Sequence, residues 1–128
     1  MNTLLSSVFL ALLAMAAVPS VLTAPLQKRD SVSAVCRDFV FDADTFALTS
    51  PCSSPGVGDS ISAISLNTCI GNNNGDLAVG VNFSSSCKQI TLNGLELSAK
   101  CQSNGGITVG SELNLDIAIT AVNGVLTC

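Results

Sequence analysis

The chain of 128 residues contains nine acidic and five basic side chains and no histidine, tryptophan or tyrosine. Without histidine it cannot carry a Ser-His-Asp or Cys-His catalytic centre or the usual zinc sites, so we expect no metal, no cofactor and no enzymatic activity. Nucleic acids and anionic membranes are not expected as partners, because both need clustered lysine and arginine.

The first element in chain order is an apolar leader over residues 1–24, which contain no charged side chain. Its apolar core, from Leu4 to Ala17, has about the length of a secretory signal and is too short for a membrane-spanning helix. Lys28-Arg29 follows, a dipeptide that eukaryotic secretory proteases recognise. We therefore predict a signal peptide over 1–24, a propeptide over 25–29 and a secreted, extracellular domain over 30–128. This domain has three basic and nine acidic residues, a net charge of −6.

An internal repeat with an offset of 49 residues divides the domain into halves of about 35–80 and 81–128. The matching patterns are Cys52-x11-Ile64-x-Leu66-Asn67-x2-Ile70-x4-Gly75-x-Leu77 and Cys101-x11-Leu113-x-Leu115-Asp116-x2-Ile119-x4-Gly124-x-Leu126. A half of about fifty residues is too small for a core of its own. We therefore expect the second hairpin of each half to pack against the three-stranded element of the other.

Six cysteines in a secreted chain predict a disulfide framework. The repeat pairs Cys36 with Cys52 in the first half and Cys87 with Cys101 in the second half. The remaining two, Cys69 and Cys128, have no cysteine at the corresponding position of the other half, so we predict a disulfide between them. The alternative is that these two are buried free thiols.

The strands and turns are predicted from local patterns. Leu95, Leu97 and Ala99 alternate with polar residues, which is the period of a strand with one buried face, and residues 39–41 and 46–49 look similar. Asn-Gly occurs at positions 74, 93, 104 and 123 and indicates tight hairpins. Asn67 and Asp116 stand where the spacing changes, and we expect each to cap a short helical turn. Each half thus becomes three strands, a helical turn and a hairpin.

Three segments together resemble the cyanovirin-N homology (CVNH) family, namely Leu48-Thr49-Ser50-Pro51-Cys52, Ile64-Ser65-Leu66-Asn67-Thr68-Cys69-Ile70 with Asn74-Gly75-Asp76-Leu77, and Asn82-Phe83 before Cys87. The resemblance covers the chain from about Val35 onward. It implies an all-β, cyanovirin-N-like, pseudo-symmetric two-repeat fold of three-stranded sheets and β-hairpins with short helical turns, linked by disulfides. It also implies a lectin with shallow pockets for mannose-containing glycans, without metal or catalysis.

The family's sugar contacts in the second repeat correspond here to Asn82, Ser85, Ser86, Gln102, Ser103 and Asn104. All six side chains can hydrogen-bond a sugar hydroxyl. The family has charged residues at some of these positions, so the resemblance implies weaker binding here or a different glycan. The alternative is an ordinary polar loop. The corresponding first-half residues are Ala34, Val35, Ser53, Ser54 and Ala121, a set that predicts a vestigial pocket.

Asn82-Phe83-Ser84 is also an N-glycosylation sequon, which makes Asn82 a possible modification site. The leading hypothesis is a secreted carbohydrate-binding protein whose partners are oligosaccharides or glycoprotein glycans. The rival hypothesis is a secreted structural or interaction protein that has kept the lectin fold with little or no sugar binding. The oligomeric state is expected to be a monomer or a domain-swapped dimer, with a hinge around 79–82.

Overall fold

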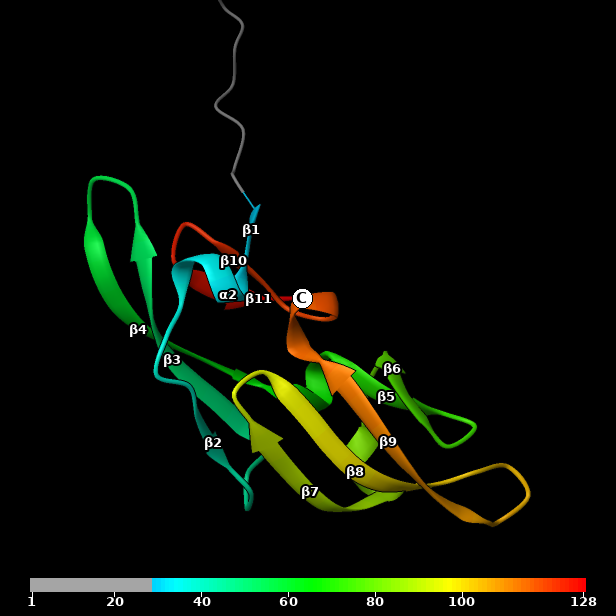
Figure 1. Cartoon of the computed structure of the whole chain (residues 1–128). Coiled ribbons are helices and arrows are strands. Elements are labelled where there is room, and N and C mark those ends of the chain that lie inside the picture. Colours follow the sequence, from blue (N-terminus) through cyan, green and yellow to red (C-terminus); the bar gives the residue numbers. More distant parts are fainter. Residues whose placement is uncertain (1–28) are drawn as a thin grey trace, which may run out of the picture.

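The protein's structure is a computed structural model, and it describes residues 29–128 (Figure 1). The predicted signal peptide, and the predicted propeptide except Arg29, lie outside the described residues. Within the described part the chain is mostly strand with short helical turns, so the predicted all-β class is confirmed. None of the helices in residues 29–128 is long and apolar enough to cross a membrane.

The two halves repeat one order of elements. The first half comprises α2 (Val32–Val35), β2 (Val40–Asp42), β3 (Ala47–Ser54), β4 (Gly58–Ser65), η2 (Leu66–Thr68), β5 (Ile70–Asn73) and β6 (Asp76–Val79). The second half comprises η3 (Phe83–Ser85), β7 (Cys87–Asn93), β8 (Glu96–Gln102), β9 (Thr108–Asn114), η4 (Leu115–Ile117), β10 (Thr120–Val122) and β11 (Val125–Thr127). The sheets are β2-β3-β4, β7-β8-β9, the β5-β6 hairpin and β10-β11, to which β1 (Arg29–Ser31) adds a strand. The turns α2 and η3, which open the halves, were not predicted.

The second hairpin of each half packs on the other half, as predicted. Figure 1 shows β6 beside β9, and β11 lies against β4. The backbone N–H of Leu77 donates to Ser111 Oγ over 2.9 Å, and that of Leu126 donates to Ser62 Oγ over 2.9 Å. These two bonds are related by the 49-residue offset. The two halves therefore exchange their second hairpins, and the contact that each exchanged hairpin makes is the same on both sides.

The core is continuous across the halves. Alternation along β8 is confirmed, because Leu97 and Ala99 are buried while Lys100 is exposed. Phe83 is fully buried at the start of the second half and meets Phe46 of the first half edge-to-face, with ring centroids 5.9 Å apart. Such a pair adds to the stabilisation from buried apolar area. One hydrophobic core therefore serves both halves.

The three predicted disulfides are present, joining Cys36 to Cys52, Cys87 to Cys101 and Cys69 to Cys128. No described cysteine is free, so the alternative of two buried thiols is wrong. The first two bonds lie within their own halves. The third joins the end of η2 to the last residue of the chain and so ties the second hairpin of the second half to the first half.

Three of the four Asn-Gly pairs lie at tight hairpin turns, and the fourth does not. At 74–75 and 123–124 the pair itself forms the turn, with positive φ at both residues. At 93–94 the turn is shifted by one residue, because Asn93 ends β7 and pairs with Glu96, which leaves Gly94, with positive φ, and Leu95 as the turn residues. Asn104 and Gly105 instead lie in a longer loop over 103–107, where the N–H of Gly106 donates to Ser103 O over 2.9 Å. Gly106 takes the positive φ of +82° there. A second glycine thus relieves the Asn-Gly pair of that conformation, and the predicted tight turn at 104–105 is wrong.

The helical turns at 66–68 and 115–117 are confirmed, but Asn67 and Asp116 do not cap their own turns. The two turns begin at Leu66 and Leu115, one residue before Asn67 and Asp116, so these two residues lie inside the turns. Asn67 Oδ1 accepts from the N–H of Ser84 over 3.1 Å, and Asn67 Nδ2 donates to Ser84 Oγ over 2.8 Å. Asp116 Oδ1 accepts from the N–H of Ser33 over 3.0 Å. Each side chain thus serves the turn that opens the other half.

Replacing Asn67 with alanine is expected to lower the free energy of unfolding by about 1–2 kcal/mol, because both bonds to Ser84 are lost. Urea denaturation measures this loss. The matched control is Asn73→Ala at an exposed strand end, which should change stability by less than about 0.5 kcal/mol. Equal effects of the two substitutions would contradict a bridging role for Asn67.

Candidate functional site

A shallow pocket of about 310 Å³ lies on the second half, which we call the second-half pocket. Its lining residues flank the Cys87–Cys101 disulfide and come from η3, β7, β8 and the start of β9. They are Ser85, Ser86, Lys88, Lys100, Gln102 and Thr108. The lining therefore combines hydroxyl, amide and ammonium groups on the rigid framework of a bridged strand pair.

The structure brings three of the six predicted site residues together in this pocket, namely Ser85, Ser86 and Gln102. The other three, Asn82, Ser103 and Asn104, are not among its lining residues. Asn82 is exposed in a left-handed conformation, and its carbonyl accepts from Ser85 Oγ over 2.9 Å. The N–H of Asn104 donates to Asn74 Oδ1 over 2.8 Å. Their contact with sugar, and glycosylation of Asn82, stay predictions.

Sequence reasoning missed Lys88, Lys100 and Thr108. Lys88 directly follows Cys87 and Lys100 directly precedes Cys101. Cys87 and Cys101 are direct partners across β7 and β8, so their neighbours are partners too. The predicted disulfide could have revealed this register, because a bridge between adjacent antiparallel strands places the flanking residues opposite each other.

Asn72 of β5 was also missed, and it holds one wall of the pocket in place. Its Nδ2 donates to Ser86 Oγ and to the carbonyl of Gln102, both over 2.8 Å. Its Oδ1 accepts from the N–H of Gly75 over 2.7 Å. The wall is thus fixed by a side chain that the first half supplies through the exchanged hairpin. The repeat counterpart of Asn72 is Ala121, which cannot make these bonds.

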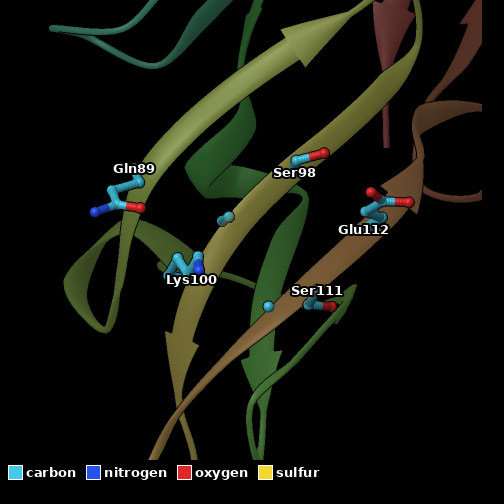
Figure 2. A pocket seen from close by; sticks show the side chains of 7 residues that line it. Gln89, Ser98, Lys100, Ser111 and Glu112 are labelled. Carbon is cyan, nitrogen blue, oxygen red and sulfur yellow. The ribbon is translucent and has the colours of Figure 1, made fainter.

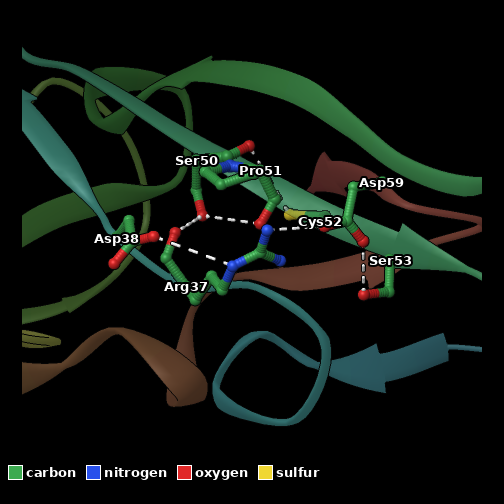
Figure 3. Close-up of polar contacts among 7 residues, drawn as sticks. All are labelled: Arg37, Asp38, Ser50, Pro51, Cys52, Ser53 and Asp59. Atoms are coloured by element: carbon green, nitrogen blue, oxygen red, sulfur yellow. Dashed lines mark hydrogen bonds and ion pairs between the residues drawn. The ribbon is translucent and has the colours of Figure 1, made fainter.

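The corresponding place in the first half has its polar groups joined to one another (Figure 3). The repeat relates Lys88, Gln102 and Thr108 to Arg37, Ser53 and Asp59, respectively. Arg37 Nη2 lies 2.6 Å from Asp59 Oδ2, and Ser53 Oγ donates to Asp59 Oδ1 over 2.9 Å. These groups therefore offer less unused hydrogen-bonding capacity to a ligand than their second-half counterparts. That the first-half pocket is vestigial stays a prediction.

The hydrogen bond from Arg37, reinforced by that from Ser53, lowers the pKa of Asp59 below its ordinary value. Because the folded pKa is depressed, this contribution to stability is fully present above about pH 4, the pKa of an unfolded aspartate, and is lost as the pH falls through the lowered pKa of Asp59. Arg37→Gln is expected to raise the pKa of Asp59 towards its ordinary value, as followed by carboxyl ¹³C NMR.

Asp42 is the internal control for this titration. Its pKa is lowered chiefly by the N–H of Asp44, which donates to Asp42 Oδ1 over 2.9 Å and does not involve Arg37. The pKa of Asp42 should therefore stay where it is in the Arg37→Gln variant. If the pKa of Asp59 also stayed where it is, the pairing of Arg37 with Asp59 would be refuted.

The described part of the chain contains no cluster of side chains that could bind a metal ion. Among residues 29–128, no group of three or more histidine, cysteine, aspartate or glutamate side chains is placed to hold a metal ion. The chemistry that the second-half pocket offers is hydrogen bonding by neutral groups together with two cations.

Comparisons with known proteins agree with this architecture. The model of the CVNH domain matches residues 33–127. GzCVNH from Gibberella zeae superposes with a TM-score of 0.69 at 25% identity, over 76% of this chain and 95% of that chain. Among curated proteins none matches the chain.

Two similar structures are complexes with saccharides. A MoCVNH3 variant with (N-GlcNAc)4 superposes with a TM-score of 0.67 at 22% identity, over 77% of this chain and 96% of that chain. A microvirin–mannobiose complex superposes with a TM-score of 0.59 at 24% identity, over 68% of this chain and 87% of that chain. At these identities the likeness establishes the fold. Because the domain model spans most of the sequence and the fold agrees, the chain belongs to the CVNH family of lectins.

Proposed function

We propose that the protein is a secreted lectin that binds mannose-containing glycans through the second-half pocket. Family membership supports carbohydrate binding, and the similar microvirin structure holds mannobiose. The three disulfides of the described residues suit an oxidising, extracellular compartment.

The observation that carries the proposal is the contrast between the two halves. The side-chain amide of Gln102 and the hydroxyl of Thr108 make no hydrogen bond within the described residues, whereas their counterparts Ser53 and Asp59 are bonded to each other. Sugar hydroxyls both donate and accept, so unpaired amide and hydroxyl groups on one wall are suitable partners. The wall that Asn72 braces is ordered before binding, which reduces the entropy lost on association.

A glycan array with the domain 30–128 tests the proposal. We expect binding to mannose-containing glycans, and a loss of about tenfold or more in affinity for Gln102→Ala and for Ser85→Ala, because each removes a hydrogen-bonding group from the pocket. Ser53→Ala, at the first-half counterpart of Gln102, is the matched control and should bind as the parent does. Asn104→Ala, tested alongside, shows whether the 103–107 loop also reaches the sugar.

The array also addresses the rival hypothesis and the choice of glycan. A signal confined to N-acetylglucosamine oligomers would keep the lectin and replace mannose as the ligand. No signal on any glycan would favour a structural or interaction protein.

Secretion has its own test. A eukaryotic secretory host should release a chain that begins at Asp30. Such a chain keeps the pairing of Asp30 with Ala121 and of Ser31 with Thr120 in the β1–β10 ladder. N-terminal sequencing of the protein recovered from the medium identifies the first residue of the mature chain. Retention of the full-length chain inside the cells would contradict secretion.

A further inference from the structure

The basic side chains of the described residues differ in whether they form ion pairs. Between 29 and 128 there are four basic residues, Arg29, Arg37, Lys88 and Lys100, against nine acidic ones. Arg37 is paired with Asp59, whereas neither Lys88 nor Lys100 makes an ion pair with any described residue. Both unpaired lysines line the second-half pocket. Two free cations therefore converge on one place in an otherwise acidic domain.

The sheet register forces the two lysines together. Lys88 and Lys100 are direct partners in the β7–β8 ladder, next to the Cys87–Cys101 pair, whose Cα atoms are 4.0 Å apart. Both lysines are exposed on the face opposite the buried disulfide. Like charges directly opposite each other across a ladder are destabilising. An anion held between the two ammonium groups would turn this repulsion into two charge-assisted contacts.

A second depression of about 420 Å³ adjoins the pocket and shares Lys100 with it; we call it the Gly110 hollow (Figure 2). Its other lining residues are Gln89, Ser98, Ala99, Gly110, Ser111 and Glu112. A Cβ added at Gly110 would meet no atom within 4 Å, so the missing side chain leaves the sheet face open there. The first-half counterpart is Ile61, whose side chain is 71% exposed on its sheet face.

The charges along the two depressions differ. The pocket is lined by both lysines and by no carboxylate, whereas in the hollow the shared Lys100 is accompanied by the carboxylate of Glu112, with the amide of Gln89 and the hydroxyl of Ser98. Figure 2 shows these three side chains on three neighbouring strands, β7, β8 and β9. A carboxylate repels an anion but accepts hydrogen bonds from sugar hydroxyls. A charged ligand group is therefore favoured in the pocket and a neutral sugar residue in the hollow.

We propose that the second-half pocket and the Gly110 hollow together bind an acidic oligosaccharide, whose anionic group lies between Lys88 and Lys100 and whose neighbouring neutral sugar lies over Gly110. The inference rests on the proposed lectin function and names its ligand class. The anionic group is a carboxylate or a phosphate ester, because both present oxygens that accept from ammonium groups. With a net charge of −6 over residues 30–128, the protein disfavours densely charged polyanions and favours glycans with isolated charges.

Calorimetric titration of the domain 30–128 tests the inference with three disaccharides: mannobiose, mannobiose with one phosphate ester, and a mannose linked to glucuronic acid. At least one acidic ligand should bind about tenfold or more tightly than mannobiose at 20 mM salt, and this advantage should shrink at 500 mM salt, where the screening length is only a few ångströms. The tighter of the two acidic ligands identifies the anionic group.

Variants test the residues. Lys88→Gln and Lys100→Gln should each reduce the ratio of acidic to neutral affinity several-fold, and Arg37→Gln, a cation on the other half, should leave the ratio as it is. Gly110→Ile copies the first-half residue at a backbone position without positive φ. It should weaken binding of the acidic disaccharide more than binding of its charged sugar alone, phosphorylated mannose or glucuronic acid, titrated in parallel. Thermal unfolding of each variant confirms that it is folded.

The outcomes separate the two proposals. If mannobiose binds as tightly as both acidic ligands and the lysine variants leave the ratio unchanged, the acidic-ligand inference is overturned while the lectin function stands. If none of the three disaccharides binds, and the glycan array is also blank, both proposals fall.

Discussion

A chain over residues 30–80 is expected to be unfolded, with a disordered far-ultraviolet circular dichroism spectrum and no cooperative thermal transition. Removing the second half strips β6 of its contact with β9 and leaves β4 without β11. The buried side chain of Leu77 loses its cover, and the bond from its N–H to Ser111 Oγ disappears. About fifty residues bury too little surface to offset their conformational entropy.

The control for this truncation is the full domain 30–128, which should show strand-rich dichroism and one cooperative transition. Phe83 sharpens the expectation, because its ring is fully buried and packs against Phe46 across the two halves. A fragment over 30–80 that melts cooperatively would refute the dependence of the first half on the shared core.

Replacing both Cys69 and Cys128 with alanine is expected to lower the free energy of unfolding by about 4 kcal/mol. The disulfide spans 59 residues. In the chain-entropy model, removing such a closure frees about 4 kcal/mol of unfolded-state entropy. This would be a large part of the 5–15 kcal/mol that typically stabilises a domain. Urea denaturation with linear extrapolation measures the change.

The matched control is the Cys36→Ala, Cys52→Ala double variant, whose disulfide spans 16 residues. Its expected loss is about 3 kcal/mol, roughly 1 kcal/mol less than for the longer span. If the loss from the Cys69 and Cys128 double variant were smaller than the loss from the control, the long-range closure would not be what holds the exchanged hairpin in place.

The sequence was sufficient for features that depend on local pattern. Alternation predicted β8, and the repeat offset predicted the in-half disulfides and the positions of both helical turns. It failed where a polar side chain had a choice of partner. Asn67 and Asp116 could serve their own turn or a distant one, and packing of the two halves brings the N–H groups of Ser84 and Ser33 within reach.

The candidate site divides in the same way. The resemblance to the CVNH family pointed to Ser85, Ser86 and Gln102, and the structure places these three in the lining of the pocket. The hydrogen bonds by which Asn72 holds the wall of the pocket were not predicted, because Asn72 belongs to the hairpin of the other half. No local pattern encodes such a contact.

The resemblance to the CVNH family placed the candidate polar site near the third and fourth cysteines of the in-half pairs. The sequence's own patterns predicted the all-β class, the duplication and the disulfide pairs. These depend on spacing along the chain, which hydrophobic alternation and cysteine position report directly. The folded structure was needed to show that Lys88 and Lys100 line one pocket and that Arg37 pairs with Asp59 in the first half. Such outcomes depend on how side chains within one half face one another in three dimensions, which hydrophobic alternation along the chain does not specify.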